Sequence, residues 1–309
     1  MPRHVYFQRE TTDPVLPRDQ VLDLVRRHVP SAAAVSGVDE SGGEARTYAV
    51  DGGIVLKVQR PQQLRTGTSL EREVVFLKHL ADCAPELSVP RVLGYGREGP
   101  LLEYTVLTRM PGVAAGRATL NPAAKRRVLE ELGGLLRRLH QVPQAPLTDS
   151  DLFPGDRGLP DLQARIGEGF LALAERLRRE SRAWRFPVPP EQIGVRLMLS
   201  LPRHEPMVAL HSNPGPTHTF VEPQTGRFTG LIDFGDAYIS HPALDLRRWA
   251  GPADQASILA GYTARAPVGD GFLAVWRAVR MLSDATVLVS GAEDADTAAD
   301  DLGRLLSEL

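Results

Sequence analysis

The hydrophobic pattern of the first hundred residues predicts a small antiparallel sheet accompanied by helices. Apolar residues recur at helical spacing over Asp19–Val29 and Ser69–Leu80. Five short apolar runs predict strands, over Ala34–Val38, Arg46–Val50, Ile54–Val58, Val89–Gly94 and Glu103–Thr108. The glycine pairs in Ser41-Gly42-Gly43 and Asp51-Gly52-Gly53 predict the turns between the first three strands.

After Met110-Pro111-Gly112 the pattern becomes helical. Asn121-Pro122 is typical of a helix start, because a capping side chain precedes a proline in the first turn. Further helices are predicted over Leu162–Trp184, Pro190–Ser200, Ala256–Ala264, Phe272–Val289 and Asp294–Leu309, with a surface loop over residues 143–161. The change of pattern predicts an N-terminal domain over residues 1–109 and a C-terminal domain over residues 110–309, which together make an α+β protein.

Composition excludes several classes of function. The 309 residues suffice for one large domain or two lobes, and their net charge of −2 provides no basic field for nucleic acid or anionic lipid. Aromatic residues make up only 6% of the chain, which argues against surfaces that stack on bases. The single cysteine, Cys83, forms no internal disulfide and suits a reducing cytoplasm. No apolar run approaches a membrane span, so we expect a cytoplasmic protein with no nucleic-acid or membrane partner.

Two charged residues in the N-terminal part form a candidate phosphate site. Lys57 stands in the otherwise apolar strand Ile54–Val58, and Glu73 stands on the helix that follows. Each alone is typical of a solvated surface residue. Together they predict an ion pair that holds the lysine against the phosphates of a nucleotide.

A candidate metal site follows in the C-terminal part. Asp233 ends an apolar run and precedes Phe234-Gly235, which predicts a carboxylate that projects from the end of a strand, where Mg²⁺ finds an oxygen ligand. An isolated aspartate of this kind would more often form a turn. Here His211-Ser212-Asn213 and His218 lie upstream, and Glu222–Gly226 predicts the tip of a hairpin that brings the two segments together.

These segments resemble, in order and spacing, the aminoglycoside phosphotransferase and choline kinase family, whose members have a two-lobed protein-kinase-like fold. The resemblance extends from about Gly37 to Trp249 and implies a small antiparallel-sheet lobe and a larger, mainly helical lobe. It implies ATP or GTP and Mg²⁺ as cofactors and a small-molecule hydroxyl as acceptor. The oligomeric state stays open.

The resemblance also implies roles for individual residues. Lys57 would contact the α- and β-phosphates with Glu73 as its partner, and the backbone around Thr108 and Met110 would hold the adenine. Asp233 would bind Mg²⁺. His211 belongs to the catalytic loop, and Asp245 resembles the buried aspartate that supports this loop.

The chain departs from the family at three places. The loop Gly37–Ala45 is not a G-x-G-x-x-G loop, and no Walker A sequence occurs. His218 stands at the second metal-ligand position, where asparagine is frequent. Imidazole is a less natural ligand of Mg²⁺ than a carboxylate or amide oxygen, so ligation by His218 stays open.

The third departure concerns the catalytic base. The family's loop reads His-Gly-Asp, whereas this chain reads His211-Ser212-Asn213. An amide accepts a hydrogen bond but does not take up a proton, and general-base assistance is worth about 10²–10⁴-fold in rate. We therefore expect nucleotide binding with greatly reduced turnover. The change is either natural, in an inactive or altered member, or a deliberate replacement of aspartate, and the completeness of the other groups favours the second interpretation.

The acceptor is not determined by the sequence. A cationic acceptor such as an aminoglycoside would need carboxylates, for which the candidates are Asp149, Asp151, Asp156, Glu168, Asp284, Glu293 and Asp296. An apolar acceptor such as a macrolide would need a hydrophobic groove, for which the candidates are Phe170, Leu173, Trp184, Leu197, Met198, Trp276 and Met281. The predicted function is an ATP-dependent O-phosphotransferase of a small molecule such as an antibiotic, for example an aminoglycoside or macrolide, and the alternative is a non-catalytic nucleotide- or ligand-binding pseudokinase.

Overall fold

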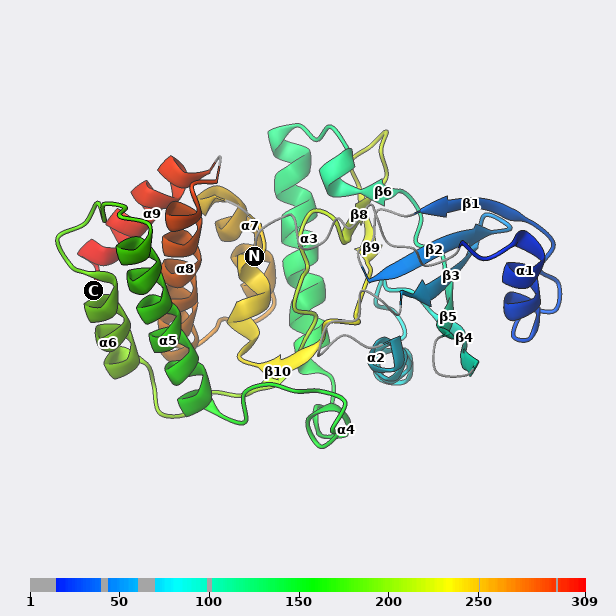
Figure 1. Cartoon of the computed structure of the whole chain (residues 1–309), viewed down its shortest axis with the longest axis horizontal. Helices are drawn as coiled ribbons and strands as arrows, with labels where there is room; N and C mark the ends of the chain where they lie inside the picture. The colour runs from blue at the N-terminus through cyan, green and yellow to red at the C-terminus, as the bar shows by residue number, and fades with distance from the viewer. Residues whose placement is uncertain (1–14, 40–43, 61–69, 99–101, 250, 293) are drawn as a thin grey trace.

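A five-stranded antiparallel sheet forms one end of the molecule (Figure 1). The computed structural model describes residues 15–39, 44–60, 70–98, 102–249, 251–292 and 294–309. The strands are β1 (Val35–Asp39), β2 (Ala45–Val50), β3 (Ile54–Gln59), β4 (Val92–Glu98) and β5 (Leu102–Thr108), in the spatial order β1-β2-β3-β5-β4. Alternation along the central strand β3 directs Leu56 and Val58 into a small core beneath helix α1 (Arg18–Arg26). Lys57 therefore points to the opposite face of the sheet, toward α2 (Leu70–Cys83).

The other end of the molecule is mainly helical (Figure 1). Its helices are α3 (Pro122–Gln141), α4 (Ala145–Thr148), α5 (Leu159–Arg179), α6 (Pro190–Ser200), α7 (Pro252–Thr263), α8 (Asp270–Ser290) and α9 (Ala295–Ser307), with 3₁₀ turns η3 (Ala115–Arg117) and η4 (Pro242–Arg247). Asn121 caps α3 through a hydrogen bond from Ala124 N to its Oδ1 (2.9 Å). The predicted α+β fold with a sheet lobe and a helical lobe is thus confirmed, while the boundary between residues 109 and 110 stays a prediction.

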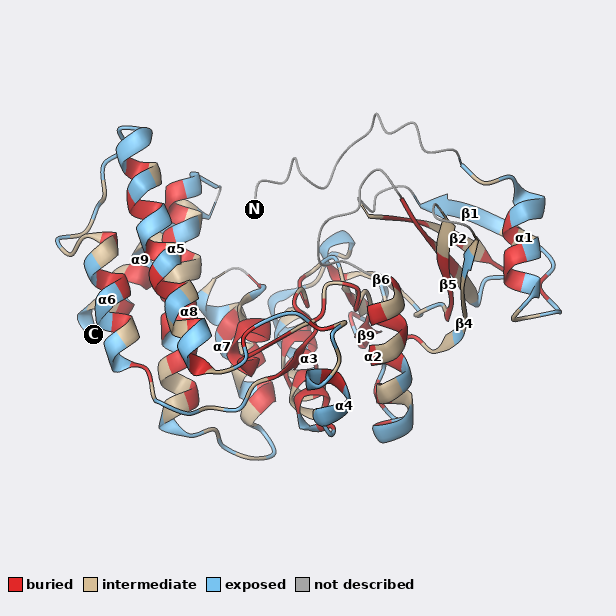
Figure 2. Ribbon diagram, turned by 60° about the horizontal axis from the view of Figure 1, so that its bottom comes forward, coloured by how far each residue is buried: buried red, intermediate tan, exposed pale blue. Residues whose placement is uncertain are grey.

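Short strands connect the two parts. The hairpin of β8 (Thr219–Val221) and β9 (Phe228–Leu231) pairs with β6 (Val113–Ala114), and β7 (Val208–Leu210) pairs with β10 (Tyr238–Ser240). Figure 2 shows that these strands run through the buried centre of the chain. The apolar face of α2, with Phe76 and Leu77, belongs to the large core of the helical part, so α2 joins the sheet to the site.

Two sequence predictions need correction. The strand predicted over Val89–Gly94 begins only at Val92, because Pro90 lacks an N–H and Ser88 instead accepts a hydrogen bond from Leu231 N (3.0 Å). The loop predicted over residues 143–161 contains the short helix α4. Ser69, at the start of the second predicted helix, and the turn Ser41-Gly42-Gly43 lie outside the described residues. Among the described helices, none is long and apolar enough to cross a membrane.

Candidate active site

Three charged residues from distant segments meet between the sheet and the hairpin. Lys57 Nζ lies 3.0 Å from Glu73 Oε2 and 2.5 Å from Asp233 Oδ1. The second oxygen of Glu73 accepts a hydrogen bond from Phe234 N (3.1 Å), so the α2 glutamate also fixes the segment that carries the aspartate. The structure therefore brings together the lysine, the glutamate and the aspartate that the sequence identified.

The electrostatics favour the charged forms of Lys57 and Asp233, whereas burial raises the pKa of Glu73. Burial alone would disfavour the charge on Lys57, but Asp233 and Glu73 outweigh this effect and raise its pKa. Burial alone would raise the pKa of Asp233, but Lys57 and His218 outweigh it and lower that pKa. The side chain of Asp233 is 39% exposed, so its carboxylate can still reach a ligand. Nucleotide phosphates would replace Asp233 as partners of the lysine and leave that carboxylate for a cation.

Asp245 organises the catalytic loop through three hydrogen bonds. Its carboxylate accepts one from His211 N and one from Ser212 N, each at 2.8 Å, and a third from His140 Nε2 at 3.1 Å. Burial alone would raise the pKa of Asp245, but the hydrogen bonds from His140 and His211 favour the charged carboxylate and lower the pKa. Tyr262 OH lies 3.1 Å from His140 Nδ1, which extends the chain of hydrogen bonds to α7. The predicted supporting role of Asp245 agrees with this geometry.

The backbone of Asn213 is fixed on both sides. Its N–H donates to His211 Nδ1 (3.2 Å), and its carbonyl accepts from His218 Nδ1 (2.8 Å). His211 Nε2 donates to the carbonyl of Ile232 (2.9 Å), and burial lowers the pKa of His211 to about 4, so this ring is neutral at pH 7. The preceding residue, Ser212, has φ 80°, a conformation that favours glycine. Among the described residues, no hydrogen bond holds the side chain of Asn213.

The residues beside Asp233 fit a divalent cation. His218 uses Nδ1–H for the Asn213 carbonyl, so its Nε2 carries a lone pair when the ring is neutral, and it lies 3.3 Å from Asp233 Oδ2. A cation between the two atoms would satisfy both. No cluster of three or more acidic, histidine or cysteine side chains for a metal occurs in the described part of the chain. Two protein ligands are compatible with Mg²⁺ because it takes its remaining ligands from phosphates and water.

Two polar groups of Thr108, in the segment predicted to hold the adenine, are already hydrogen-bonded. Thr108 N donates to Arg91 O (2.9 Å), and its hydroxyl accepts from Arg91 N (2.8 Å), so both groups are occupied. The N–H of Met110 makes no backbone hydrogen bond with the described residues. A Cβ on Gly230 would lie 2.5 Å from the backbone oxygen of Ser88, and Gly230 has φ 154°, so glycine is required where the Met110 side chain crosses the hairpin. Met110 thus remains the better candidate for a contact with adenine.

Most candidates for an acceptor pocket are buried, already paired or outside the described residues. Of the apolar ones, Phe170, Leu173, Leu197, Trp276 and Met281 are buried in the core of the helical part. Among the acidic candidates, Asp156 forms an ion pair with Arg165, and Asp284 is buried near Asp301. Glu293 lies outside the described residues.

Sequence reasoning missed several side chains that hold the site together. Arg72 Nη1 donates to Gly235 O (3.1 Å), Arg248 Nε to Ser212 O (2.6 Å) and Trp249 Nε1 to Pro214 O (3.0 Å). All three donate to carbonyls of the loops at the site. Side-chain donors to backbone carbonyls leave no spacing signal in a sequence, although Arg248 and Trp249 closely follow Asp245.

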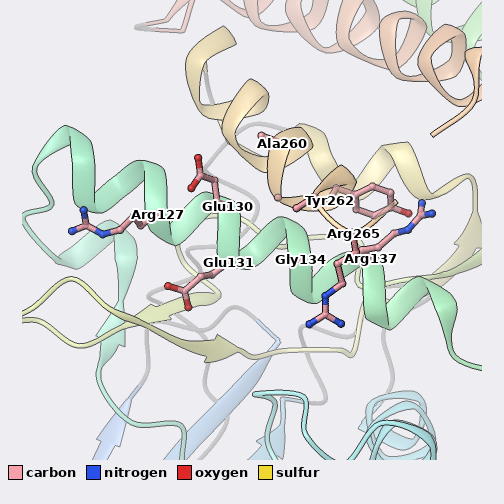
Figure 3. A pocket seen from close by; sticks show the side chains of 10 residues that line it. Arg127, Glu130, Glu131, Gly134, Arg137, Ala260, Tyr262 and Arg265 are labelled. Carbon is pink, nitrogen blue, oxygen red and sulfur yellow. The ribbon is translucent and has the colours of Figure 1, made fainter. Parts of the chain in front are cut away.

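A separate cavity of about 500 Å³ opens between α3 and α7 (Figure 3). Its lining includes Arg127, Glu131, Arg137, Tyr262 and Arg265, and none of the lining residues belongs to the phosphate site. Tyr262 connects it to the catalytic loop through His140 and Asp245.

A small sheet lobe whose lysine meets an aspartate of a helical lobe defines the class of kinase-like phosphotransferases. The profile of the phosphotransferase enzyme family matches residues 38–282, and the chain belongs to this family. An aminoglycoside 3'-phosphotransferase of Streptomyces ribosidificus is 28% identical over 193 residues, which cover 58% of this chain and 68% of that protein. A second aminoglycoside 3'-phosphotransferase, of Streptomyces fradiae, is 27% identical over 190 residues, which cover 58% of this chain and 67% of that protein.

Solved structures show the same fold. The GDP complex of an aminoglycoside 2'-phosphotransferase-IIIa has a TM-score of 0.60 at 20% identity, over 95% of this chain and 98% of that one. A macrolide 2'-phosphotransferase from Brachybacterium faecium has a TM-score of 0.57 at 22% identity, over 92% and 98%. The expected family and fold class are thereby confirmed, and the chain is a small-molecule phosphotransferase by descent.

Proposed function

We propose that the protein binds Mg-ATP between its lobes and transfers the γ-phosphate to a hydroxyl group of a small molecule. The junction of Lys57, Glu73 and Asp233 carries this proposal, because it places a paired cation beside a half-exposed carboxylate. Lys57 binds phosphate oxygens, Glu73 holds Lys57, and Met110 with the backbone of Thr108 contacts the base. The named activities of the relatives make aminoglycosides and macrolides the first acceptors to examine.

Asp233 and His218 would hold Mg²⁺ against the phosphates, and the cation would supply charge neutralisation for the transferred group. Asn213 lies in the catalytic-base position, on the loop that Asp245 and His211 support. Its amide oxygen accepts a hydrogen bond from the acceptor hydroxyl and orients it without taking the proton. Positioning and electrostatic stabilisation provide much of the rate of phosphoryl transfer, so the amide leaves a slow reaction rather than none.

A second candidate function is supported by the same asparagine. A pseudokinase would retain Lys57, Glu73 and Asp233 for nucleotide binding and would lack turnover because Asn213 does not act as a base. Both functions include nucleotide binding. They differ in whether Asn213→Asp restores turnover.

Turnover and binding should be measured on the same four proteins. ATP consumption is followed with a panel of aminoglycosides, macrolides and small amino alcohols, for the natural chain, Asn213→Asp, Lys57→Ala and the double variant Lys57→Ala/Asn213→Asp. Thermal stabilisation by Mg-ATP is recorded in parallel. We expect both proteins with Lys57 to be stabilised by Mg-ATP, and Asn213→Asp to turn over about 10²–10⁴-fold faster.

Nucleotide stabilisation without turnover of any acceptor, including the acidic acceptors described below, in either protein with Lys57 selects the pseudokinase. No stabilisation by Mg-ATP or Mg-GTP in either one refutes the kinase proposal. Equal stabilisation of Lys57→Ala removes this lysine from the phosphate role.

A further inference from the structure

Three arginines gather around the start of the catalytic loop. Tyr238 on β10 pairs with Leu210, the residue before His211. The guanidinium carbon of Arg165 on α5 lies 5.6 Å from the centre of the Tyr238 ring, and Arg248 Nε donates to Ser212 O (2.6 Å). Arg247 ends η4, two residues after Asp245, and interacts electrostatically with all of Arg165, Tyr238 and Arg248. Arg248 therefore contacts the backbone next to Asn213, and Arg165 and Arg247 lie near Tyr238, on the strand that pairs with the start of the loop.

Of the three arginines, only Arg165 forms an ion pair with a described residue. Arg165 forms an ion pair with Asp156 and donates to Ser240 Oγ (3.0 Å). Neither Arg247 nor Arg248 forms an ion pair with any residue in the described ranges. The carboxylate of Asp245 is close to Arg247, but its oxygens already accept from two backbone N–H groups and His140.

The environment of Arg247 is unfavourable for a free cation. Its Nε is buried and has no hydrogen-bond partner within the described part of the chain. Burial, followed by the positive charge of Arg248, lowers the pKa of the Arg247 guanidinium to about 10. Buried guanidinium groups ordinarily pair with carboxylates or phosphates, which they bind through two parallel hydrogen bonds. An oxyanion at this position would compensate both Arg247 and Arg248.

We propose that the acceptor carries an oxyanionic group, a carboxylate or a phosphate, which Arg247 and Arg248 bind while the acceptor's hydroxyl lies at Asn213. This inference rests on the proposed phosphotransfer and specifies its substrate class. Two guanidinium groups without an ion pair to a described residue disfavour a polycationic aminoglycoside, and the nearby Asp156 is paired with Arg165. The alternative oxyanion for these two arginines is the γ-phosphate of the nucleotide, and the second measurement distinguishes it from an acidic acceptor.

The first measurement concerns stability and binding in the nucleotide-free protein. Arg247→Met keeps the side-chain volume and removes the buried charge, whereas Arg247→Lys retains a charge. We expect Arg247→Met to raise Tm by about 2–4 °C and to lose the stabilisation that inorganic phosphate gives the natural protein. Arg247→Lys should retain part of the response to phosphate. Arg277→Met, an exposed arginine on α8, is the matched control and should respond as the natural chain does. Unchanged phosphate stabilisation in Arg247→Met would overturn the anion site.

The second measurement identifies the source of the anion. Affinities for Mg-ATP and Mg-ADP are compared in Arg247→Met, and phosphorylation of matched acceptor pairs (glycerate with glycerol, gluconate with glucose) is compared in Asn213→Asp. We expect nucleotide affinities to change less than about twofold and the acidic acceptors to be preferred at least about tenfold in kcat/KM, which corresponds to about one charge-assisted hydrogen bond. This preference should disappear in Asn213→Asp/Arg247→Met.

Two outcomes would overturn the inference and spare the proposed function. One is a tenfold loss of ATP affinity with ADP affinity unchanged, which assigns the site to the γ-phosphate. The other is faster transfer to neutral or polycationic acceptors. Failure of the proposed function itself is recognised separately. In that case Mg-ATP does not stabilise the proteins that retain Lys57, and this is measured before any acceptor is added.

Discussion

Replacement of Asp245 by asparagine tests how the catalytic loop is held. The carboxylate is 1% exposed and accepts from His211 N, Ser212 N and His140 Nε2. An amide offers one oxygen and turns an NH₂ group toward the remaining donors, so at least one buried N–H loses its acceptor. Hydrogen bonds to a charged group contribute about 1.5–3 kcal/mol each, and an unsatisfied buried donor costs about 1–3 kcal/mol. We therefore expect Asp245→Asn to lower the free energy of unfolding by about 3–5 kcal/mol.

Urea unfolding followed by tryptophan fluorescence measures this loss, because Trp249 donates to Pro214 O in the same loop. Asp300→Asn, at an exposed position on α9, is the control for a change of charge alone and should cost less than about 0.5 kcal/mol. In Asp245→Asn, the stabilisation by Mg-ATP should weaken as well, because His218 contacts both the Asn213 carbonyl of the loop and the carboxylate of Asp233. A loss below about 1 kcal/mol would show that the loop does not depend on these bonds.

Three further predictions concern the surroundings of this loop. Ser212→Gly should stabilise the protein by up to about 1 kcal/mol, because Ser212 has φ 80°; a lower midpoint in urea would contradict the strain. Tyr262→Phe should cost about 1–2 kcal/mol, since His140 Nδ1 loses its donor while the stack on Phe272 remains; an unchanged urea midpoint would show that this bond adds nothing. Burial lowers the pKa of His241 to about 3 from an unfolded value near 6.5, so the unfolded chain binds the proton first and stability falls as the pH drops below about 6.5. His241→Asn keeps an acceptor for Ala243 N. Between pH 7 and pH 5 this variant should lose about 2 kcal/mol less unfolding free energy than the unchanged chain, and equal losses in the two proteins would refute the assignment.

Periodicity predicted the long elements well because their burial is one-sided. Helix α6 has the predicted bounds Pro190–Ser200, and β3 extends the predicted Ile54–Val58 by one residue. Errors occurred where a contact far along the chain decides the structure. Val89 was assigned to a strand, although its neighbour Ser88 accepts from Leu231, a contact that local pattern does not contain.

The ionic part of the site was predictable because Lys57, Glu73 and Asp233 each stand in a recognisable local pattern and the family resemblance orders them. The arginines around the loop were not predictable. Arg165 lies on α5, whereas Arg247 and Arg248 are consecutive residues at the end of η4, and their significance depends on which carboxylates are already occupied. Charge compensation is a property of the folded arrangement, so a list of acidic residues by position does not reveal which carboxylates are already paired.

The geometry of the catalytic loop bears on the origin of Asn213. Where the family's loop reads His-Gly-Asp, the positive φ of Ser212 gives the physical reason for glycine, and serine at that angle costs about 1 kcal/mol or more. A single exchange made to silence the base would have left that glycine in place. We infer that two adjacent departures favour natural divergence of the loop over one deliberate replacement. The bonds of Asp245 to both backbone N–H groups compensate the strained serine, which explains how the loop keeps its shape with both residues changed. If this is correct, Ser212→Gly/Asn213→Asp should regain turnover beyond Asn213→Asp alone, whereas a loop altered at one position only would gain nothing from the glycine.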